Sequence, residues 1–165
     1  MIRWAEVGDA EQLAEVHVRT WQRAYEHLFP EEFLLGLDRG LRACWWRRFV
    51  GEGNRVQVAE DAGQVVGFCH ADSSADEGWG EIFSIYVSPA HWGQGHGHAL
   101  LAAGESTLLA KGHEMALLWV LEGNDRGRRF YERQRWTIGK PVRLEEIGGV
   151  QVTEVRYEKD LTDGL

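Results

Sequence analysis

Glycine occupies three alternate positions in one short run of the chain, Gly93, Gly95 and Gly97. Because glycine has no Cβ atom, a ligand can lie directly against the backbone at such positions. Successive N–H groups can then point into one concavity at the start of a helix, where the positive end of the helix dipole favours an anion such as a pyrophosphate. The run predicts a diphosphate site, and a tight turn without a ligand is the simpler alternative.

Two other phosphate-binding loops fit these residues less well. A Walker loop needs a lysine followed by serine or threonine, and no lysine lies near the glycine run. A dinucleotide fingerprint that starts at Gly93 needs glycine where His98 stands, although Glu122 can imitate the ribose-binding acid. About forty residues follow Glu122, too few for a second nucleotide-binding half, so a dinucleotide-binding oxidoreductase is a weak alternative.

The elements on either side of the glycine run must position its amide groups. The mostly apolar residues from Ile82 to Val87 stop at Ser88-Pro89 and predict a strand buried on both faces. After the run, apolar residues on one side predict a helix that Lys111-Gly112 closes with a glycine cap. We therefore expect a strand, a glycine loop and a helix in that order.

The rest of the chain shows both helix and strand patterns. A capping box of Asp9 and Gln12 predicts the start of one helix, and Asp38 is expected to cap another. The buried side of that second helix is expected to hold Leu41, Cys44, Trp45, Arg48 and Phe49. Further elements are expected as strands at 2–4 and 115–121 and helices at 31–35 and 125–134. Hairpins are expected of 56–59 with 65–68 and of 136–144 with 150–157, the latter across Gly148-Gly149, and residues 72–80 are expected to form a small, polar loop. Together they predict an α/β fold with a mixed, mostly antiparallel central sheet flanked by helices.

Composition limits the classes of protein to which the chain can belong. With 165 residues, 44% hydrophobic and 27% charged, it fits one globular domain over residues 1–165. A formal charge of −8 disfavours nucleic acid, and the basic group of Arg126, Arg128 and Arg129 is interpreted as a solvated helix face. Cys44 and Cys69 form no paired motif and are expected to be core thiols. The sequence has no leader-like or membrane-spanning apolar run, so we expect a cytoplasmic protein that binds no membrane.

Two motifs at a suitable separation resemble those of the GCN5-related N-acetyltransferase (GNAT) family. The stretch Glu81-Ile-Phe-Ser-Ile-Tyr-Val-Ser-Pro-Ala-His-Trp-Gly-Gln-Gly-His-Gly-His-Ala-Leu-Leu is similar to the family's motif A. Asn124 with Phe130-Tyr-Glu-Arg is similar to its motif B, and the order of elements is similar over nearly the whole chain. The resemblance implies an enzyme that transfers an acetyl group from acetyl-CoA to a primary amine by direct attack in a ternary complex.

The same resemblance implies roles for individual residues. The backbone of Ile85, Tyr86 and Val87 would pair with the pantetheine arm and the acetyl carbonyl, because a strand edge offers N–H groups to an amide-rich ligand. Asn124 would anchor the cofactor. Tyr131 would protonate the departing thiolate, and Glu81 would act as general base. The pyrophosphate would lie on Gly93, Gln94, Gly95, His96, Gly97 and His98.

Some of these assignments have simpler alternatives, and some positions depart from the family pattern. Tyr131 can be a packing residue, and Glu81 can be a surface carboxylate. Branches that acetylate protein N-termini place a glutamate five positions before the motif B asparagine, where this chain has Trp119. Trp92 replaces the usual Gln or Arg of motif A, which removes a side chain but no backbone donor. Arg135 replaces the glycine that usually ends motif B, which suggests a different local turn.

Histidines and aromatic residues complete the set of candidate site residues. His91, His96 and His98 lie close in sequence, but no cysteine or acidic side chain stands beside them, so no metal is expected. Trp21 and Tyr25 are most simply packing residues, and the more specific hypothesis is that they line an acceptor pocket. The acceptor is expected to be a small-molecule or peptide amine, and the sequence leaves both a monomer and a homodimer open. The rival from another class is a non-catalytic acyl-CoA sensor that keeps the anion site without the chemistry.

Overall fold

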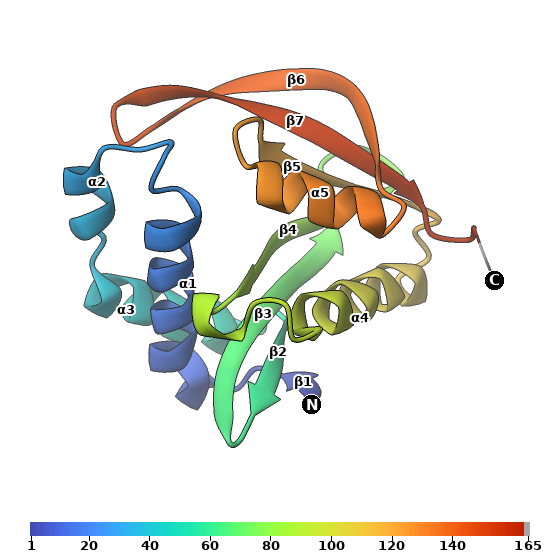
Figure 1. Ribbon diagram of the computed structural model, residues 1–165. Helices are drawn as coiled ribbons and strands as arrows, with labels where there is room; N and C mark the ends of the chain where they lie inside the picture. The colour runs from blue at the N-terminus through green and yellow to red at the C-terminus, as the bar shows by residue number, and fades with distance from the viewer. Residues whose placement is uncertain (164–165) are drawn as a thin grey trace. The chain divides into compact units, whose positions relative to one another are not determined.

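One mixed sheet runs through the computed structural model, which describes residues 1–163 (Figure 1). Its strands are β1 (Ile2–Trp4), β2 (Val56–Asp61), β3 (Gln64–Ser73), β4 (Trp79–Val87), β5 (Met115–Leu121), β6 (Thr137–Ile147) and β7 (Val150–Asp160), in the order β1-β2-β3-β4-β5-β7-β6. The pairs β1–β2, β2–β3, β5–β7 and β6–β7 are antiparallel, whereas β4 and β5 are parallel. The expected mixed, mostly antiparallel sheet flanked by helices is confirmed.

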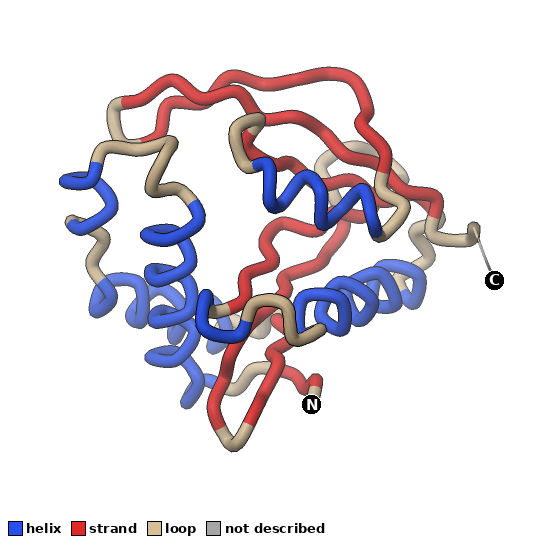
Figure 2. The backbone as a smooth tube through the Cα atoms, in the orientation of Figure 1, coloured by secondary structure: helices blue, strands red, loops and turns tan. Residues whose placement is uncertain are grey.

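The helices lie between the strands in the order that the sequence predicts (Figure 2). They are η1 (Val7–Asp9), α1 (Ala10–Ala24), α2 (Glu31–Leu35), α3 (Arg39–Gly51), η2 (Pro89–His91), α4 (His96–Ala110) and α5 (Asp125–Arg133), of which η1 and η2 are 3₁₀ helices. Within residues 1–163, no helix is both long and apolar enough to cross a membrane.

The chain divides into two units. Unit 1 contains residues 1–70 and 84–104, and unit 2 contains residues 71–83 and the chain from Glu105 onward. A single domain over residues 1–165 stays a prediction, and its last two residues lie outside the described part.

In unit 1, α1 and α3 pack against β2 and β3. The 3.6-residue period of α1 places Leu13 and Val16 in this core, where they meet Trp46 from α3. Val58 and Phe68 complete the contact from the strands, and all five side chains are at most 3% exposed. The apolar stripe of α1 is therefore what holds the helix on the sheet.

The first part of α4 lies against β2 and β3 through other residues of unit 1. Gln57 on β2 donates from Nε2 to the Ala103 carbonyl at 3.2 Å. A Cβ atom at Gly67 on β3 would lie 2.9 Å from Leu100 Cδ1 and 2.8 Å from the Tyr86 carbonyl oxygen. Glycine at this position therefore allows the close approach of the helix and of β4 to β3.

The predicted buried side of α3 is wrong. Ala43 and Trp46 are the buried residues of the helix, and Trp46 reaches Phe68 with a ring-centroid distance of 4.8 Å. Adjacent tryptophans make two sides of this helix apolar, so its period alone does not select one. Four residues that were expected inside are exposed: Leu41, Cys44, Trp45 and Arg48. The expectation of a core thiol is wrong for Cys44 and confirmed for Cys69.

The helix start predicted at Asp9 is confirmed, because Asp9 is the N-cap residue of α1, but the predicted capping box with Gln12 is wrong. The Asp9 carboxylate instead accepts from both terminal nitrogens of Arg3, at 2.8 and 2.9 Å, and from the Glu6 N–H at 2.8 Å. Gln12 accepts the Val65 N–H at 2.8 Å rather than capping the helix. A paired guanidinium is a stronger partner for a carboxylate than a backbone amide, so the ion pair takes the side chain.

In unit 2, β6 and β7 form a long hairpin, with α5 beside it in Figure 1. Its turn has left-handed glycines at Gly148 and Gly149, as predicted. On β4, a Cβ atom at Gly80 would lie 2.9 Å from the Leu108 side chain, so the last turns of α4 pack closely there. The expectation that β4 is buried on both faces is wrong, because Phe83 is 48% exposed.

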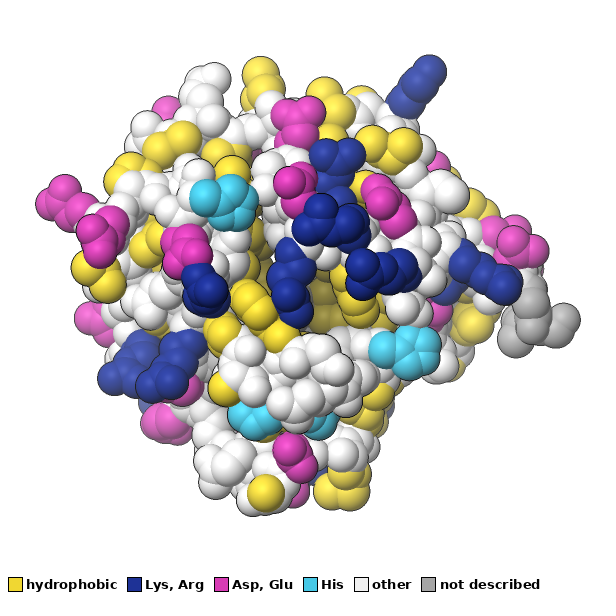
Figure 3. Space-filling model, viewed as in Figure 1, with side chains coloured by type: hydrophobic (Ala, Val, Ile, Leu, Met, Phe, Trp, Pro, Cys, Tyr) yellow, Lys and Arg dark blue, Asp and Glu magenta, His cyan; other side chains and the backbone are white. Residues whose placement is uncertain are grey.

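Dark-blue basic side chains gather over α5 in Figure 3. Arg126 and Arg129 are exposed there, so the predicted solvated face is correct for them. The prediction is wrong for Arg128, which donates from Nε to the Tyr157 hydroxyl at 3.2 Å.

Helix α5 ends in a Schellman turn whose left-handed residue is not glycine. Arg135 has a φ of 66°, and its N–H donates to the Glu132 carbonyl at 3.1 Å. The Trp136 N–H donates to the Tyr131 carbonyl, also at 3.1 Å. Helix α4 ends in the same way at Gly112, as predicted, with a φ of 89°. The expectation of a different turn at Arg135 is wrong, since the turn is kept despite its cost.

We expect glycine at this position to stabilise the protein. A left-handed backbone costs a non-glycine residue about 1–2 kcal/mol, and the greater freedom of unfolded glycine offsets about half of that gain. Arg135→Gly should therefore raise the Tm by about 2 °C in scanning calorimetry. Arg135→Ala keeps a Cβ atom and serves as the control. An equal rise in both variants would show that the lost charge, rather than φ, is the cause.

A second prediction concerns His17, which lies among the rings of unit 1. The ring centroids of Tyr86, Phe68 and Trp46 lie 5.2, 5.9 and 6.1 Å from that of His17. Burial, to which the positive charge of Arg42 adds, lowers the pKa of His17 to about 3. The imidazole therefore stays neutral in the folded protein above that pH.

The unfolded chain binds a proton at His17 near pH 6.5, so the folded state loses stability as the pH falls from that value toward 3. Between pH 7 and pH 5 this site should cost about 2 kcal/mol of the unfolding free energy. Urea unfolding of His17→Phe at both pH values should lack that loss, whereas His27→Gln, at an exposed histidine, should keep it. The same loss in His17→Phe would contradict the assignment.

Candidate active site

The residues predicted to form the site belong to both units. Unit 1 holds the glycine run, the end of β4 and the two aromatic residues of the first helix region, Trp21 and Tyr25. Unit 2 holds Glu81, Asn124 and Tyr131.

The glycine run links β4 to α4 through η2. Gly93 and Gly95 have φ values of 77° and 88°, which L side chains rarely adopt. A Cβ atom at either position would meet no atom of the described chain within 4 Å. The backbone conformation therefore favours glycine at both positions, and the space beside them is open.

Backbone donors lie at the start of α4. The helix makes its first i→i−4 bond when Ala99 donates to the Gly95 carbonyl at 3.1 Å, so the N–H groups of His96 and Gly97 precede that bond. They lie at the positive end of the helix dipole. Gln94 spans the turn, since its Nε2 donates to the Ala90 carbonyl at 3.2 Å. This arrangement can hold an anion through its backbone.

The carbonyl of Val87, the last residue of β4, accepts two side-chain hydrogen bonds within unit 1. Trp92 donates to it from Nε1 at 2.7 Å, and Thr20 on α1 donates from its hydroxyl at 3.1 Å. These bonds use both lone pairs of the carbonyl. Trp92 thus replaces the usual Gln or Arg with a side chain that fastens the loop to the strand before it.

Around the three histidines of this region, the described part of the chain gathers no set of metal-ligating side chains. The rings of His91 and His96 are 6.1 Å apart, between centroids. Among residues 1–163, no group of three or more His, Cys, Asp or Glu side chains is placed to hold a metal ion.

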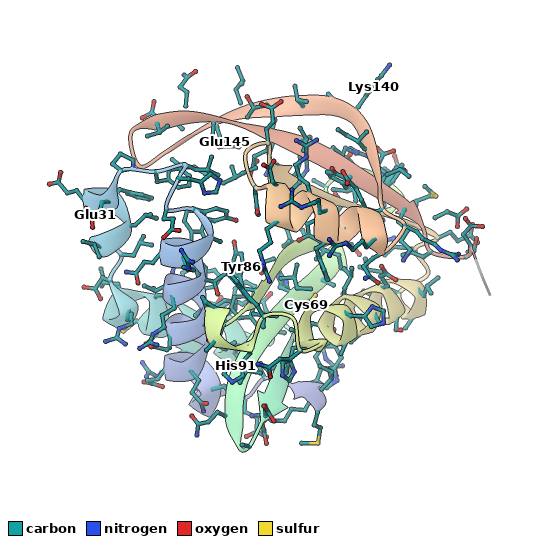
Figure 4. The ribbon with its side chains drawn as sticks, in the orientation of Figure 1. Glu31, Cys69, Tyr86, His91, Lys140 and Glu145 are labelled. Carbon is teal, nitrogen blue, oxygen red and sulfur yellow. The ribbon has the colours of Figure 1, made fainter. Side chains whose placement is uncertain are left out.

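Trp21 and Tyr25 lie in one row of aromatic rings. The Trp21 indole donates from Nε1 to the Tyr86 hydroxyl at 3.1 Å, and its ring meets that of Tyr25 edge-on at 4.9 Å. Tyr25 is only 7% exposed, whereas Trp21 and Tyr86 are partly exposed. Figure 4 labels Tyr86 on β4, between α1 and the start of α4. Trp21 can therefore contact a ligand beside Tyr86, and Tyr25 supports it from behind.

In unit 2, Asn124 caps α5. Its Oδ1 accepts the Gly127 N–H at 3.0 Å. A Cβ atom at Gly127 would lie 2.6 Å from Asn124 Nδ2, so glycine is needed for the cap to close. No hydrogen-bond partner of Nδ2 is found in the described chain, which leaves this NH₂ group as the one that can bind a ligand.

Glu81 lies on β4, opposite Leu117 in the pairing with β5. The hydroxyl of Ser74 donates to Glu81 Oε2 at 2.7 Å and accepts the Asp76 N–H at 3.2 Å. The carboxylate is partly buried, and the serine orients it. Such a group can accept a proton and pass it to solvent.

Tyr131 lies on the last turn of α5. Its ring is 6.2 Å from that of Tyr157 and 6.4 Å from that of Trp136, between centroids. Its own carbonyl accepts the N–H groups of Gln134 and Trp136 at 2.9 and 3.1 Å. The residue is therefore fixed through both its backbone and its ring.

Sequence reasoning missed the residues that support these groups. Thr20 lies 67 positions before its partner Val87, and no local pattern links the two. Ser74 lies in a small, polar loop that was expected only as a connection. Tyr157 was placed in a strand, but its bonds to α5 depend on how β7 pairs with β5. Only a tertiary arrangement could have revealed them.

Comparisons with known proteins agree with these features. The model of the acetyltransferase (GNAT) family matches residues 11–135. The N-acetyltransferase YuaI of Bacillus subtilis is 33% identical over 162 residues, which cover 93% of this chain and 89% of the relative. Mycothiol acetyltransferase of Thermobispora bispora is 37% identical over 89 residues, and that match spans 49% of this chain and only 30% of the relative.

Solved structures share the fold at lower identity. An N-acetyltransferase of Staphylococcus aureus Mu50 has a TM-score of 0.76 and 18% identity, with 98% of each chain covered. The PaiA N-acetyltransferase of Thermoplasma acidophilum, in complex with coenzyme A, has a TM-score of 0.70 and 20% identity, with 97% of this chain and 99% of the other covered. Because the family model covers most of the chain and a full-length relative is 33% identical, this chain belongs to the acetyltransferase (GNAT) family.

Proposed function

We propose that this protein transfers an acetyl group from acetyl-CoA to a primary amine by direct attack in a ternary complex. The observation that carries the proposal is the left-handed glycine loop between β4 and the N-terminus of α4. A pyrophosphate is the part of acetyl-CoA that such a loop suits. In the proposal it is held by the backbone from Gly93 to His98.

The end of β4 would bind the pantetheine arm through the backbone of Ile85, Tyr86 and Val87. Because the Val87 carbonyl already accepts bonds from Trp92 and Thr20, we assign it no ligand contact. Asn124 would bind the cofactor through Nδ2, since Oδ1 is used by the helix cap.

The chemical roles fall to Glu81 and Tyr131. The neutral amine nitrogen attacks the acetyl carbonyl carbon, the C–S bond breaks, and an amide and a thiolate form. Glu81, directly or through a water, accepts the proton that the amine loses, and Tyr131 donates one to the thiolate. Phenol and thiol pKa values, about 10 and about 8.5, are close enough for this transfer.

The acceptor is proposed to be a small-molecule or peptide amine that binds beside Trp21. The hydrogen bond from the Trp21 indole to the Tyr86 hydroxyl supports this placement, because it joins Trp21 to the strand that is proposed to bind the pantetheine arm. Tyr25 would act by holding the Trp21 ring rather than by contact.

A binding test followed by a turnover test examines this function. CoA and acetyl-CoA should raise the Tm, whereas NAD should not. Thiol release with a panel of amines should then fall about 100-fold in Tyr131→Phe and in Glu81→Gln, while both variants keep the CoA-induced shift. Stabilisation by NAD alone would refute the donor. Binding without thiol release for any amine would favour a non-catalytic acyl-CoA sensor.

A separate prediction concerns the loop anchor. Trp92→Phe keeps a ring but removes the bond to the Val87 carbonyl, which is worth about 1 kcal/mol. The KM for acetyl-CoA should rise about fivefold at nearly constant kcat. Trp45→Phe, at a 45% exposed tryptophan on α3, is the matched control and should change neither constant. An unchanged KM in Trp92→Phe would show that the bond does not support donor binding.

A further inference from the structure

Tyr157 on β7 is a fully buried tyrosine whose hydroxyl is bonded on both sides by one helix. The residue is 0% exposed. Arg128 donates from Nε to the hydroxyl oxygen at 3.2 Å, and the hydroxyl donates to Glu132 Oε1 at 2.7 Å. Both partners belong to α5, one turn apart, so two side chains of the helix converge on a single atom of the sheet.

Helix α5 needs such attachments because it has little apolar surface. It is nine residues long and contains no buried residue. A helix of this length is not stable by itself, and most helices are held by an apolar face. Here polar contacts take that place, including a bond from Arg128 Nη1 to the Glu122 carbonyl at 3.1 Å.

Tyr131 lies between the two residues that hold Tyr157. Arg128 precedes it by three positions and Glu132 follows it directly, so both anchors lie within one turn of Tyr131. The Tyr157 ring contacts one side of the phenol. On the Trp136 side, Glu105 accepts from the indole Nε1 at 2.8 Å and from Lys159 Nζ at 2.8 and 2.9 Å.

The charges of this cluster agree with a fixed arrangement. Burial raises the pKa of Tyr157, so the hydroxyl keeps its proton and stays a donor to Glu132. The Glu132 carboxylate therefore accepts a hydrogen bond from a hydroxyl on a fully buried residue of β7. Rotation of α5 about its axis would break this bond and that of Arg128 together.

We propose that Tyr157, bound by Arg128 and Glu132, is a positioning residue that sets the rotation of α5 and thereby the direction of the Tyr131 phenol. The inference rests on the proposed role of Tyr131 as the acid. It assigns to Tyr157 no contact with substrate or donor.

The test compares Tyr157→Phe in two backgrounds. In the native background it should lower kcat about tenfold, with the KM for acetyl-CoA changed less than about twofold, because a misdirected acid slows chemistry and not binding. In Tyr131→Phe it should cause no further loss, since the group that it directs is gone. Thr137→Val, which removes a hydroxyl bond on the neighbouring β6, is the matched control and should leave kcat unchanged.

A second pair of variants covers the case in which Tyr157→Phe does not fold. Glu132→Ala should lower kcat about tenfold as well, and Glu132→Gln, whose amide oxygen can still accept the hydroxyl, should restore most of it. A fall in Tm with unchanged kcat in these variants would overturn the positioning role. Equal losses in both Tyr131 backgrounds would do the same. If Tyr131→Phe itself keeps full activity, the acid role fails first, and the positioning role fails with it.

Discussion

Two left-handed glycines control the path of the chain from β4 into α4. At Gly93 and Gly95 the backbone turns into the helix. The first amide groups of α4 come before the first i→i−4 hydrogen bond and therefore have no partner within the helix. No side chain of an L residue fits this conformation without strain. The strand before the turn is fixed by the Val87 carbonyl, which Trp92 and Thr20 hold from two directions. The Val87 carbonyl oxygen therefore joins the glycine loop to the end of β4.

In unit 2, the main constraint is the attachment of helix α5. This helix has too little apolar surface to dock by burial, so hydrogen bonds to groups inside the unit replace it. Asn124 closes the first turn, the left-handed Arg135 closes the last, and the Tyr157 hydroxyl holds the middle. Each of these contacts lies within four residues of Asn124 or Tyr131. Asn124 and Tyr131, to which roles are proposed, therefore lie beside fixed points of the helix.

Features that depend only on residues close together in the sequence could be predicted, and features that depend on tertiary contacts could not. The turn glycines at Gly112 and Gly148 and the cap at Asp38 act within a few residues, and the structure confirms them. The buried side of α3 was mispredicted because Trp45 and Trp46 make two sides of the helix equally apolar.

Contacts between side chains that lie on different elements could not be predicted, because their causes are not local in the sequence. Asp9 occupies the predicted N-cap position of α1, but its carboxylate binds a guanidinium from β1 instead of the helix amides. Arg128 was expected to face solvent, but a hydroxyl from β7 provides a partner within the unit. A side chain with two available partners takes the stronger one, and the sequence alone does not show which partners are near.

A crystal structure with bound acetyl-CoA tests the central claim most directly. The account predicts that pyrophosphate oxygens lie about 3 Å from backbone nitrogens between Gly93 and His98, with the Val87 carbonyl still bonded to Trp92 and Thr20. A pyrophosphate bound elsewhere, with this loop left without a ligand, would contradict it.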